Sequence, residues 1–267
     1  MKNNIVLVFL GTTALGLMFG TEVHGGIVMI NPTKDNTIYA ENGGLSNGAG
    51  QGIYVGVTAG NNGTTIRRAL VQFDVAGNVP AGSTINSVTL TLQKVIFGPS
   101  ADADILELHP VSTAWGEGTS FGVGKGAAAT ANDATWQFRQ FSTQSWTNPG
   151  GDFGATSGIL ALDAIGATYT VSSQSGMVTN VQNWLNTPAS NFGWLLKYSD
   201  ENATATARAF GSRESGSAAP VLTIDFSPVP EPGSCLLLSV AAIVMSTRRR
   251  FARNLDKNGA FVHFLGG

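Results

Sequence analysis

Several stretches of this 267-residue chain carry residue types that could perform chemistry, and the first is centred on Ser46. Gly44-Leu-Ser-Asn-Gly48 matches the G-x-S-x-G pattern, in which a strand before the serine and a helix after it expose the hydroxyl on a sharp turn. Glycine, asparagine, serine and alanine dominate from residue 41 to residue 52. That composition predicts an exposed loop, so a catalytic serine is not expected.

A second stretch offers oxygen ligands for a metal ion. Asp102 and Asp104 are spaced as in a calcium-binding loop, but such a loop needs further oxygen ligands and a glycine at set spacing, and Ile105 and Leu106 break the pattern. We therefore predict no metal-ligand set, and only a structural calcium ion is left open.

Nitrogen and sulfur ligands are equally scarce. His109 precedes Pro110 at the end of a predicted strand and is interpreted as structural, because His24 and His263 fall outside the predicted folded domain. The only cysteine, Cys235, lies in a C-terminal apolar run, which excludes a disulfide within the chain and a zinc site built on cysteines. No cofactor is expected.

Phosphate binding and acid–base catalysis lack the required spacing. Lys125 lies in Gly122-Val-Gly-Lys-Gly126, which has neither the spacing nor the Ser or Thr of a phosphate-binding loop. Arg213 and Glu214 are predicted to form a local ion pair. A glycosidase needs two carboxylates about 5 to 9 Å apart, but spacing selects no pair among the 17 Asp and Glu residues. A non-enzyme is therefore predicted, with a polysaccharide lyase or hydrolase as an alternative.

Aromatic residues are concentrated in a long segment that glycines interrupt: Trp115, Phe121, Trp136, Phe138, Phe141, Trp146 and Phe153. Sugar rings present apolar C–H faces, so exposed tryptophans beside polar groups would form a carbohydrate-binding site. We predict such a site at Trp115, Trp136, Arg139 and Trp146. The alternative is that these rings fold inward and close the segment over one end of the domain.

Strands predominate among the predicted secondary-structure elements. Apolar residues alternate with mostly polar ones at residues 65–75 and 84–92, with an irregularity near Asn86 and Ser87, as is typical of a two-sheet sandwich. Further strands are predicted at residues 26–30, 37–40, 52–57, 103–111, 158–162, 167–171, 192–197, 207–213 and 220–226. Apolar spacings of three and four predict one helix of about ten residues, anchored in the core by Trp184 and ended before Pro188.

Charge limits the partners of the folded part. Between residues 26 and 228, 9 Lys and Arg residues stand against 14 Asp and Glu residues, a net charge of −5. Binding of nucleic acid needs a concentrated basic face, so a nucleic-acid partner is not expected. The length suits one domain of about 200 residues with processing segments at both ends.

The middle of the chain resembles the DNRLRE domain over residues 31–226, nearly the whole predicted globule. The resemblance lies in Arg68-Ala-Leu-Val-Gln-Phe-Asp-Val75, Val79-Pro-Ala-Gly-Ser-Thr-Ile85, Trp115-Gly-Glu-Gly, Asn191-Phe-Gly-Trp-Leu-Leu-Lys197, Phe210-Gly-Ser-Arg-Glu214 and Pro220-Val-Leu-Thr-Ile224. It implies an all-β fold, a jelly-roll-like antiparallel β-sandwich with one short helix, and relatives that include polysaccharide-binding modules. It implies no particular ligand, because fold and function separate easily.

The N-terminus has the pattern of a secretory signal peptide, predicted as residues 1–25. Lys2 precedes an uncharged apolar stretch at residues 5–19, and small residues follow. Cleavage is predicted after Val23-His24-Gly25, with Gly20 as the competing position. A folded domain at residues 26–226 follows.

The C-terminal region is predicted to contain a proline-rich linker and sorting motif at residues 227–232, a short transmembrane helix with its arginine cluster at residues 233–250, and a tail at residues 251–267. Its 15 charge-free residues, 233–247, would extend only about 22 Å as a helix, short of a hydrocarbon core of about 30 Å. Pro230-Glu231-Pro232, the apolar run and Arg248-Arg249-Arg250 closely resemble a PEP-CTERM sorting signal. The resemblance implies an exosortase as processing partner and transient anchoring in the membrane.

Together these features predict an exported, non-catalytic protein that binds polysaccharide. The resemblance of the sorting signal implies a place at the cell surface or in the exopolysaccharide matrix of a Gram-negative-type bacterium. One alternative is a structural matrix or adhesion protein without affinity for glycans, and the other is the lyase or hydrolase above.

Overall fold

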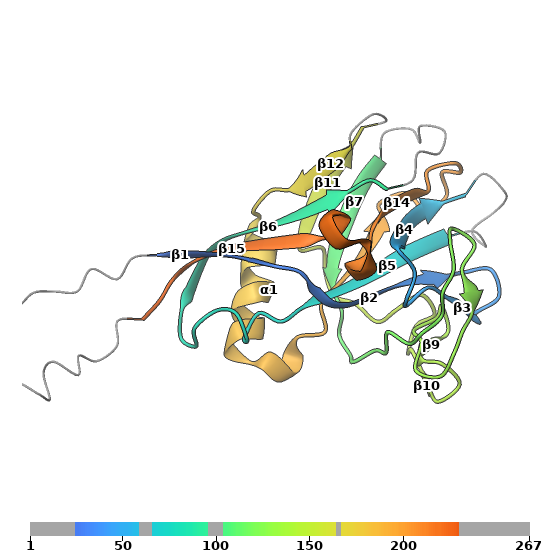
Figure 1. The fold of residues 1–267 in the computed structure, drawn as a ribbon, viewed down its shortest axis with the longest axis horizontal. Coiled ribbons are helices and arrows are strands. Elements are labelled where there is room, and N and C mark those ends of the chain that lie inside the picture. Colours follow the sequence, from blue (N-terminus) through green and yellow to red (C-terminus); the bar gives the residue numbers. More distant parts are fainter. Residues whose placement is uncertain (1–24, 59–65, 96–103, 164–166, 230–267) are drawn as a thin grey trace, which may run out of the picture. The chain divides into compact units, whose positions relative to one another are not determined.

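The structure is a computed structural model that describes residues 25–58, 66–95, 104–163 and 167–229 (Figure 1). The predicted signal peptide up to His24, the sorting signal with Pro230, Glu231, Pro232 and its arginines, and the tail lie outside these ranges, as does Asp102. Within the ranges, no helix is long and apolar enough to cross a membrane.

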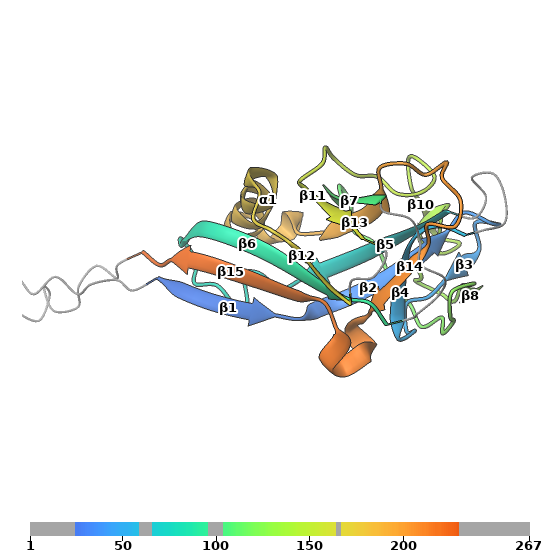
Figure 2. The same cartoon turned by 90° about the horizontal axis from the view of Figure 1, so that it is seen from above.

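Two antiparallel sheets make up most of the fold, which confirms the all-β prediction. The smaller sheet has the strand order β1 (Gly26–Ile30), β15 (Val221–Ser227), β6 (Thr84–Gln93) and β12 (Thr168–Val171). The larger has the order β11 (Gly158–Leu162), β7 (Asp104–Pro110), β13 (Trp194–Tyr198), β5 (Ile66–Phe73), β4 (Gly52–Val57) and β14 (Arg208–Gly211), and β2 (Pro32–Tyr39) also pairs with β5. Figure 2 shows the two sheets as separate layers.

The alternating residues of both sheets meet in one main core. Ala69, Val71 and Phe73 of β5 are fully buried together with Val88, Leu90 and Leu92 of β6. Ile85 pairs with Phe226 whereas Ser87 pairs with Asp225, so Asn86 is an extra residue that forms a β-bulge. The bulge shifts the alternation by one residue, as the sequence pattern near Asn86 predicted.

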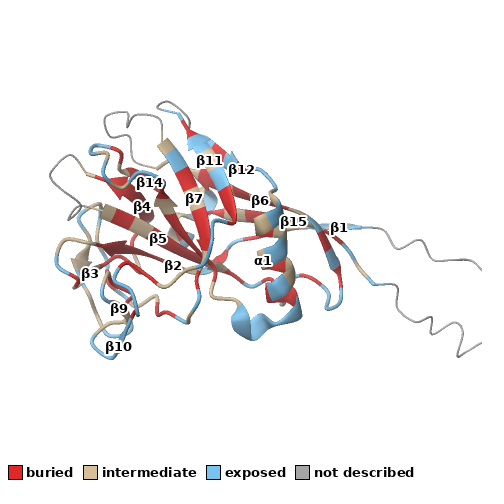
Figure 3. Ribbon diagram, turned by 180° about the vertical axis from the view of Figure 1, so that it is seen from behind, coloured by how far each residue is buried: buried red, intermediate tan, exposed pale blue. Residues whose placement is uncertain are grey.

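Helix α1 (Ser175–Asn186) packs its apolar side into the main core. Met177, Val181, Trp184 and Leu185 are buried, whereas the opposite side of the helix faces solvent (Figure 3). The Trp184 ring lies 4.6 Å from the ring of Trp194, which confirms Trp184 as a core anchor. A short 3-10 helix, η1 (Pro188–Ser190), begins at the proline that ends α1.

A second core lies on the other face of β5. The alternation places Leu70 on the mostly polar face of β5, opposite Ala69 and Val71. Leu70 is nevertheless fully buried, in this second core. Its neighbours include Ile38 of β2, Leu195 of β13 and two tryptophans of the segment at residues 112–157. That segment contains only short strands, β8 (Ala127–Ala128), β9 (Phe138–Gln140) and β10 (Gln144–Ser145), and it covers the sheet with side chains.

The prediction of an exposed loop at residues 41–52 is wrong. Ser46 and Asn47 are fully buried, and Ser46 lies in the short strand β3 (Leu45–Ser46), which pairs with β8. The Ser46 hydroxyl lies 2.9 Å from Asn36 Oδ1 and 2.8 Å from Ala134 O, so it is committed to structural contacts. A Cβ atom at Gly48 would lie 1.8 Å from Glu117 O, which shows that glycine serves close packing here.

Strand β2 is also longer than predicted. It begins at Pro32 rather than near residue 37, because proline is tolerated as the first residue of a strand. Asp35 and Asn36 within it are fully buried, and Asn36 Nδ2 donates to Glu117 O at 2.7 Å. Hydrogen bonds to distant segments keep these polar residues in the strand.

Candidate functional site

Two of the predicted carbohydrate-binding tryptophans lie inside the second core. Trp115 is 2% exposed and Trp146 is 5% exposed. The indole Nε1 of Trp115 donates to Phe192 O at 2.8 Å, and that of Trp146 donates to Thr135 O at 2.8 Å. These two rings therefore offer no face to a sugar. They fold inward, as the alternative interpretation of the aromatic residues expects.

The other two predicted residues hold the same segment in place. Trp136 is half-buried, and the Arg68 guanidinium lies 4.7 Å from its ring centroid. Arg68 also donates to both carboxylate oxygens of Glu201, at 2.7 and 2.6 Å. Arg139 donates to Ala114 O at 2.9 Å. Trp115 and Trp146 thus lie in the second core, Trp136 packs against it, and Arg139 is bonded to the backbone of the same segment.

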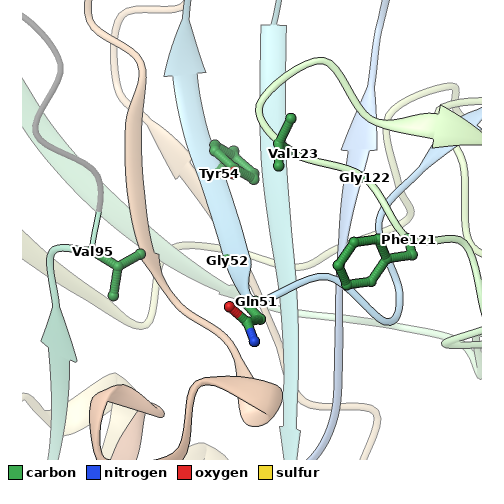
Figure 4. A pocket seen from close by; sticks show the side chains of 7 residues that line it. All are labelled: Gln51, Gly52, Tyr54, Val95, Phe121, Gly122 and Val123. Atoms are coloured by element: carbon green, nitrogen blue, oxygen red, sulfur yellow. The ribbon is translucent and has the colours of Figure 1, made fainter.

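A different aromatic residue of the segment is exposed beside a cavity. Phe121 is 67% exposed and Val123 is 68% exposed. The cavity next to them measures about 210 Å³ and is lined by Gln51, Gly52, Tyr54, Val95, Phe121, Gly122 and Val123 (Figure 4). Strand β4 and the residue before it supply Gln51, Gly52 and Tyr54, Val95 follows the end of β6, and the segment supplies the rest. These groups form the candidate site, which we name the Phe121 cavity.

The backbone around Phe121 is held by buried polar groups. Gly122 N donates to Asn47 Oδ1 at 2.7 Å, and Gly126 N donates to Val123 O at 2.6 Å to close a turn. Gly126 has φ +69°, and a Cβ atom there would lie 2.9 Å from the Tyr39 ring, so glycine is required. The aromatic ring is therefore presented to solvent by an ordered turn. This ordering favours binding because little conformational entropy is lost.

Part of this site could be found in the sequence and part could not. The sequence shows Phe121 among the aromatic residues of the segment, but the predicted site consists of tryptophans and Arg139. Tyr54 and Gln51 carried no signal, because Tyr54 lies in an apolar run that predicts a fully buried strand. Their approach to Phe121 depends on how the segment packs against β4.

A charged cluster joins three distant parts of the chain: Asp35 in strand β2, Glu117 in the segment at residues 112–157, and Arg213 and Glu214 near the C-terminal end of the domain. Asp35 N donates to Glu117 Oε1 at 2.9 Å, and Arg213 N donates to Asp35 Oδ2 at 2.6 Å. The Arg213 guanidinium donates to both Glu117 oxygens at 3.1 Å and pairs with Glu214 at 2.7 Å, which confirms the predicted Arg213–Glu214 ion pair. Arg213 begins the 3-10 element η2 (Arg213–Ala218).

Burial controls protonation within this cluster. Asp35 is fully buried, and desolvation raises its pKa to about 8, despite the hydrogen bond from Arg213. Desolvation also raises the pKa of Glu117. Asp35 has no surface through which it could contact a substrate, so this carboxylate pair lacks the access that glycoside hydrolysis requires.

His109 has a structural environment. Its Nδ1 lies 3.0 Å from Gly154 O, its Nε2 lies 3.2 Å from Glu107 Oε2, and its ring packs 4.9 Å from that of Phe153. Across the four described ranges, no group of three or more His, Cys, Asp or Glu side chains could hold a metal ion.

Comparison with known proteins assigns no family to this architecture, because no family model and no curated protein matches the chain.

Proposed function

We propose that this protein is an exported, non-catalytic polysaccharide-binding protein of the cell surface or exopolysaccharide matrix. The observation that carries the proposal is the exposed Phe121 ring beside the Phe121 cavity. An exposed aromatic residue on an ordered turn suits stacking against the apolar face of a sugar ring. The Gln51 side chain, which is exposed at the same cavity, supplies donors and an acceptor for sugar hydroxyls.

Stacking on Phe121 would contribute measurably to affinity. Full burial of a phenylalanine side chain contributes about 1.5 to 3 kcal/mol. About two thirds of this side chain remains to be covered, since it is 67% exposed. The expected contribution is about 1 to 2 kcal/mol, which is a factor of about 5 to 30 in Kd.

We further infer a jelly-roll-like β-sandwich of the DNRLRE type. Residues quoted for that resemblance are far apart in sequence but meet in the fold. Glu117 contacts Arg213, and Trp115 donates to Phe192 O. Such convergence supports the interpretation that these residues form one structural unit rather than separate chance matches.

Export and sorting form the second half of the proposal. A signal peptide at residues 1–25 and a PEP-CTERM signal at residues 230–250 would direct the protein across the inner membrane to an exosortase. The first and last strands of the domain lie side by side, with Gly26 paired to Phe226. The two predicted signals would therefore join the domain at the same end. A processing enzyme would therefore approach the domain from one end.

Glycan arrays and affinity gels with the purified full chain test the binding proposal. We expect Phe121→Ala to weaken retention by the glycan that binds the unaltered protein. Met29→Ala is the matched control, because Met29 is 69% exposed but lies on β1, away from the cavity lining. Equal retention of both variants, or retention by no glycan, would contradict the proposal.

A structural matrix or adhesion protein is the second candidate function, and strand β1 favours it. Within the described residues β1 pairs with β15 alone, and it exposes Ile27 at 71% and Met29 at 69%. Apolar residues on an edge strand are a recognised route to association. Loss of matrix integrity in Ile27→Lys or Met29→Lys strains, without any glycan affinity in vitro, would favour this function over the first.

A further inference from the structure

We propose that the Phe121 cavity takes an uncharged sugar ring and that the protein discriminates against acidic polysaccharides. This inference rests on the proposed function, because it specifies the chemical class of glycan at the same site. Four observations carry it: the chemistry of the lining, the internal partners of the cations, the net charge of the domain, and the size of the cavity.

The lining of the cavity contains no charged side chain. Its polar side chains are the Gln51 amide and the Tyr54 phenol, and burial raises the pKa of Tyr54, so the phenol stays neutral. Phe121, Val123 and Val95 make the rest of the side-chain surface apolar. A carboxylate or sulfate placed here would lose water without gaining an ion pair, which is unfavourable.

Five cations of the described domain are engaged with internal partners. Ion pairs join Arg67 to Glu41, Arg68 to Glu201, Lys197 to Glu107, and Arg213 to Glu117 and Glu214. Lys34 donates to Trp115 O at 2.6 Å and lies 4.2 Å from the Trp115 ring centroid. A polyanion would have to compete with these internal contacts for the five cations.

The net negative charge of the domain opposes the binding of a polyanion. Residues 26–228 carry a net charge of −5, so approach of an acidic polysaccharide is unfavourable at low salt. Exposed Lys125 follows Val123 by two residues but does not line the cavity. A neutral glycan meets no such repulsion, and its affinity would depend little on salt.

The size of the cavity limits how much of a glycan enters. Its volume of about 210 Å³ is below the range of about 300 to 1,000 Å³ typical for pockets that enclose drug-sized ligands. One sugar ring stacked on Phe121 therefore fits better than an enclosed oligosaccharide. Neighbouring units of the chain would stay outside the cavity.

Affinity electrophoresis of the full chain through neutral and acidic polysaccharides tests the inference. We expect retention by at least one neutral glucan, mannan or galactan, and none by alginate or pectate. Measurement at about 0.01 M and about 1 M salt, between which the Debye length falls from about 30 Å to about 3 Å, should change the neutral Kd less than about twofold. A free monosaccharide of the same type should compete.

Three variants distinguish neutral-glycan binding at the cavity from binding of acidic polysaccharides elsewhere. Phe121→Ala should weaken neutral binding about 5- to 30-fold, whereas Lys125→Gln and Met29→Ala should leave it unchanged, with circular dichroism confirming that each variant is folded. Retention by alginate or pectate that falls with salt and is lost in Lys125→Gln would overturn the inference but leave glycan binding intact. Retention by no glycan of either charge would overturn both proposals.

Discussion

Asp35 is a carboxylic acid enclosed by the fold, and its surroundings determine its protonation. Its Oδ2 atom accepts a hydrogen bond from Arg213 N at 2.6 Å, whereas its Oδ1 atom has no hydrogen-bond partner among the described residues. Glu117 and Glu214 add negative charge nearby. Because burial raises its pKa to about 8, Asp35 is mainly protonated at neutral pH.

Asp35 should make stability depend on pH. Its folded pKa of about 8 exceeds the ordinary aspartate pKa of 3.8, so between these values the folded state holds a proton that the unfolded state has lost. The free energy of unfolding should therefore fall by about 1.4 kcal/mol per pH unit from this group as pH rises from about 5 to 7. Urea unfolding of Asp35→Asn at the same pH values should lack this contribution. Parallel pH profiles for the two proteins would contradict the assignment.

The buried and exposed aromatic residues should respond differently to truncation. Trp146→Ala leaves a cavity in the second core and removes the donor to Thr135 O, so we expect a loss of about 3 to 5 kcal/mol in the free energy of unfolding. Phe121→Ala should change it by no more than about 0.5 kcal/mol, because the ring is exposed. Denaturant unfolding of both variants measures the contrast. Similar losses would show that Phe121 also supports the fold.

At the scale of elements, strand alternation predicts the sheets well and the packing of the long segment poorly. Alternation in β5 and β6 places Val71 and Leu90 in the main core, and the bulge at Asn86 follows from the same pattern. The burial of Leu70 and Ser46 depends on residues 112–157, which fold back over β5 and β3. Short-range sequence patterns do not indicate which distant segment packs over a strand.

Prediction of the candidate site from the sequence is limited in the same way. Phe121 could be recognised as an aromatic residue between glycines, but its exposure and the burial of Trp115 depend on which face of the segment meets the sheet. The contacts among Asp35, Glu117 and Arg213 join positions separated by about 80 to 180 residues, and no spacing rule links them. Residue types could therefore be anticipated, whereas their neighbours could not.

Close packing of the glycine-rich residues 41–52 gives a prediction about stability. In Gly48→Ala the new Cβ atom would lie 1.8 Å from Glu117 O, so the backbone must move and stability should fall by about 1 to 3 kcal/mol. Gly44→Ala is the matched control, because its nearest neighbour would be 3.7 Å away, an ordinary contact. Thermal unfolding of the pair checks the expectation. Equal melting temperatures would show that the segment can move away from Glu117 freely.

At the scale of the whole molecule, the proposed sorting signal predicts where the mature chain ends. Exosortase processing should cut near Pro230, Glu231 and Pro232, just beyond β15, which ends at Ser227. Mass spectrometry of protein released from the cell surface should therefore find a C-terminal peptide that ends in this region. Recovery of intact peptides that include Arg248, Arg249 and Arg250 would refute the processing step.

The position of β15 gives an attached protein a mechanical property. This strand lies between β1 and β6, with Phe226 paired to Gly26 on one side and to Ile85 on the other. Strand β4, which lines the Phe121 cavity, lies away from the start of β1 in the ribbon (Figure 1). If a glycan holds the protein at this cavity while a tether pulls at residue 229, the force runs along the strand. Both ladders are then sheared, and their hydrogen bonds must break together rather than one by one, so the domain would resist extraction from a flowing or shrinking matrix.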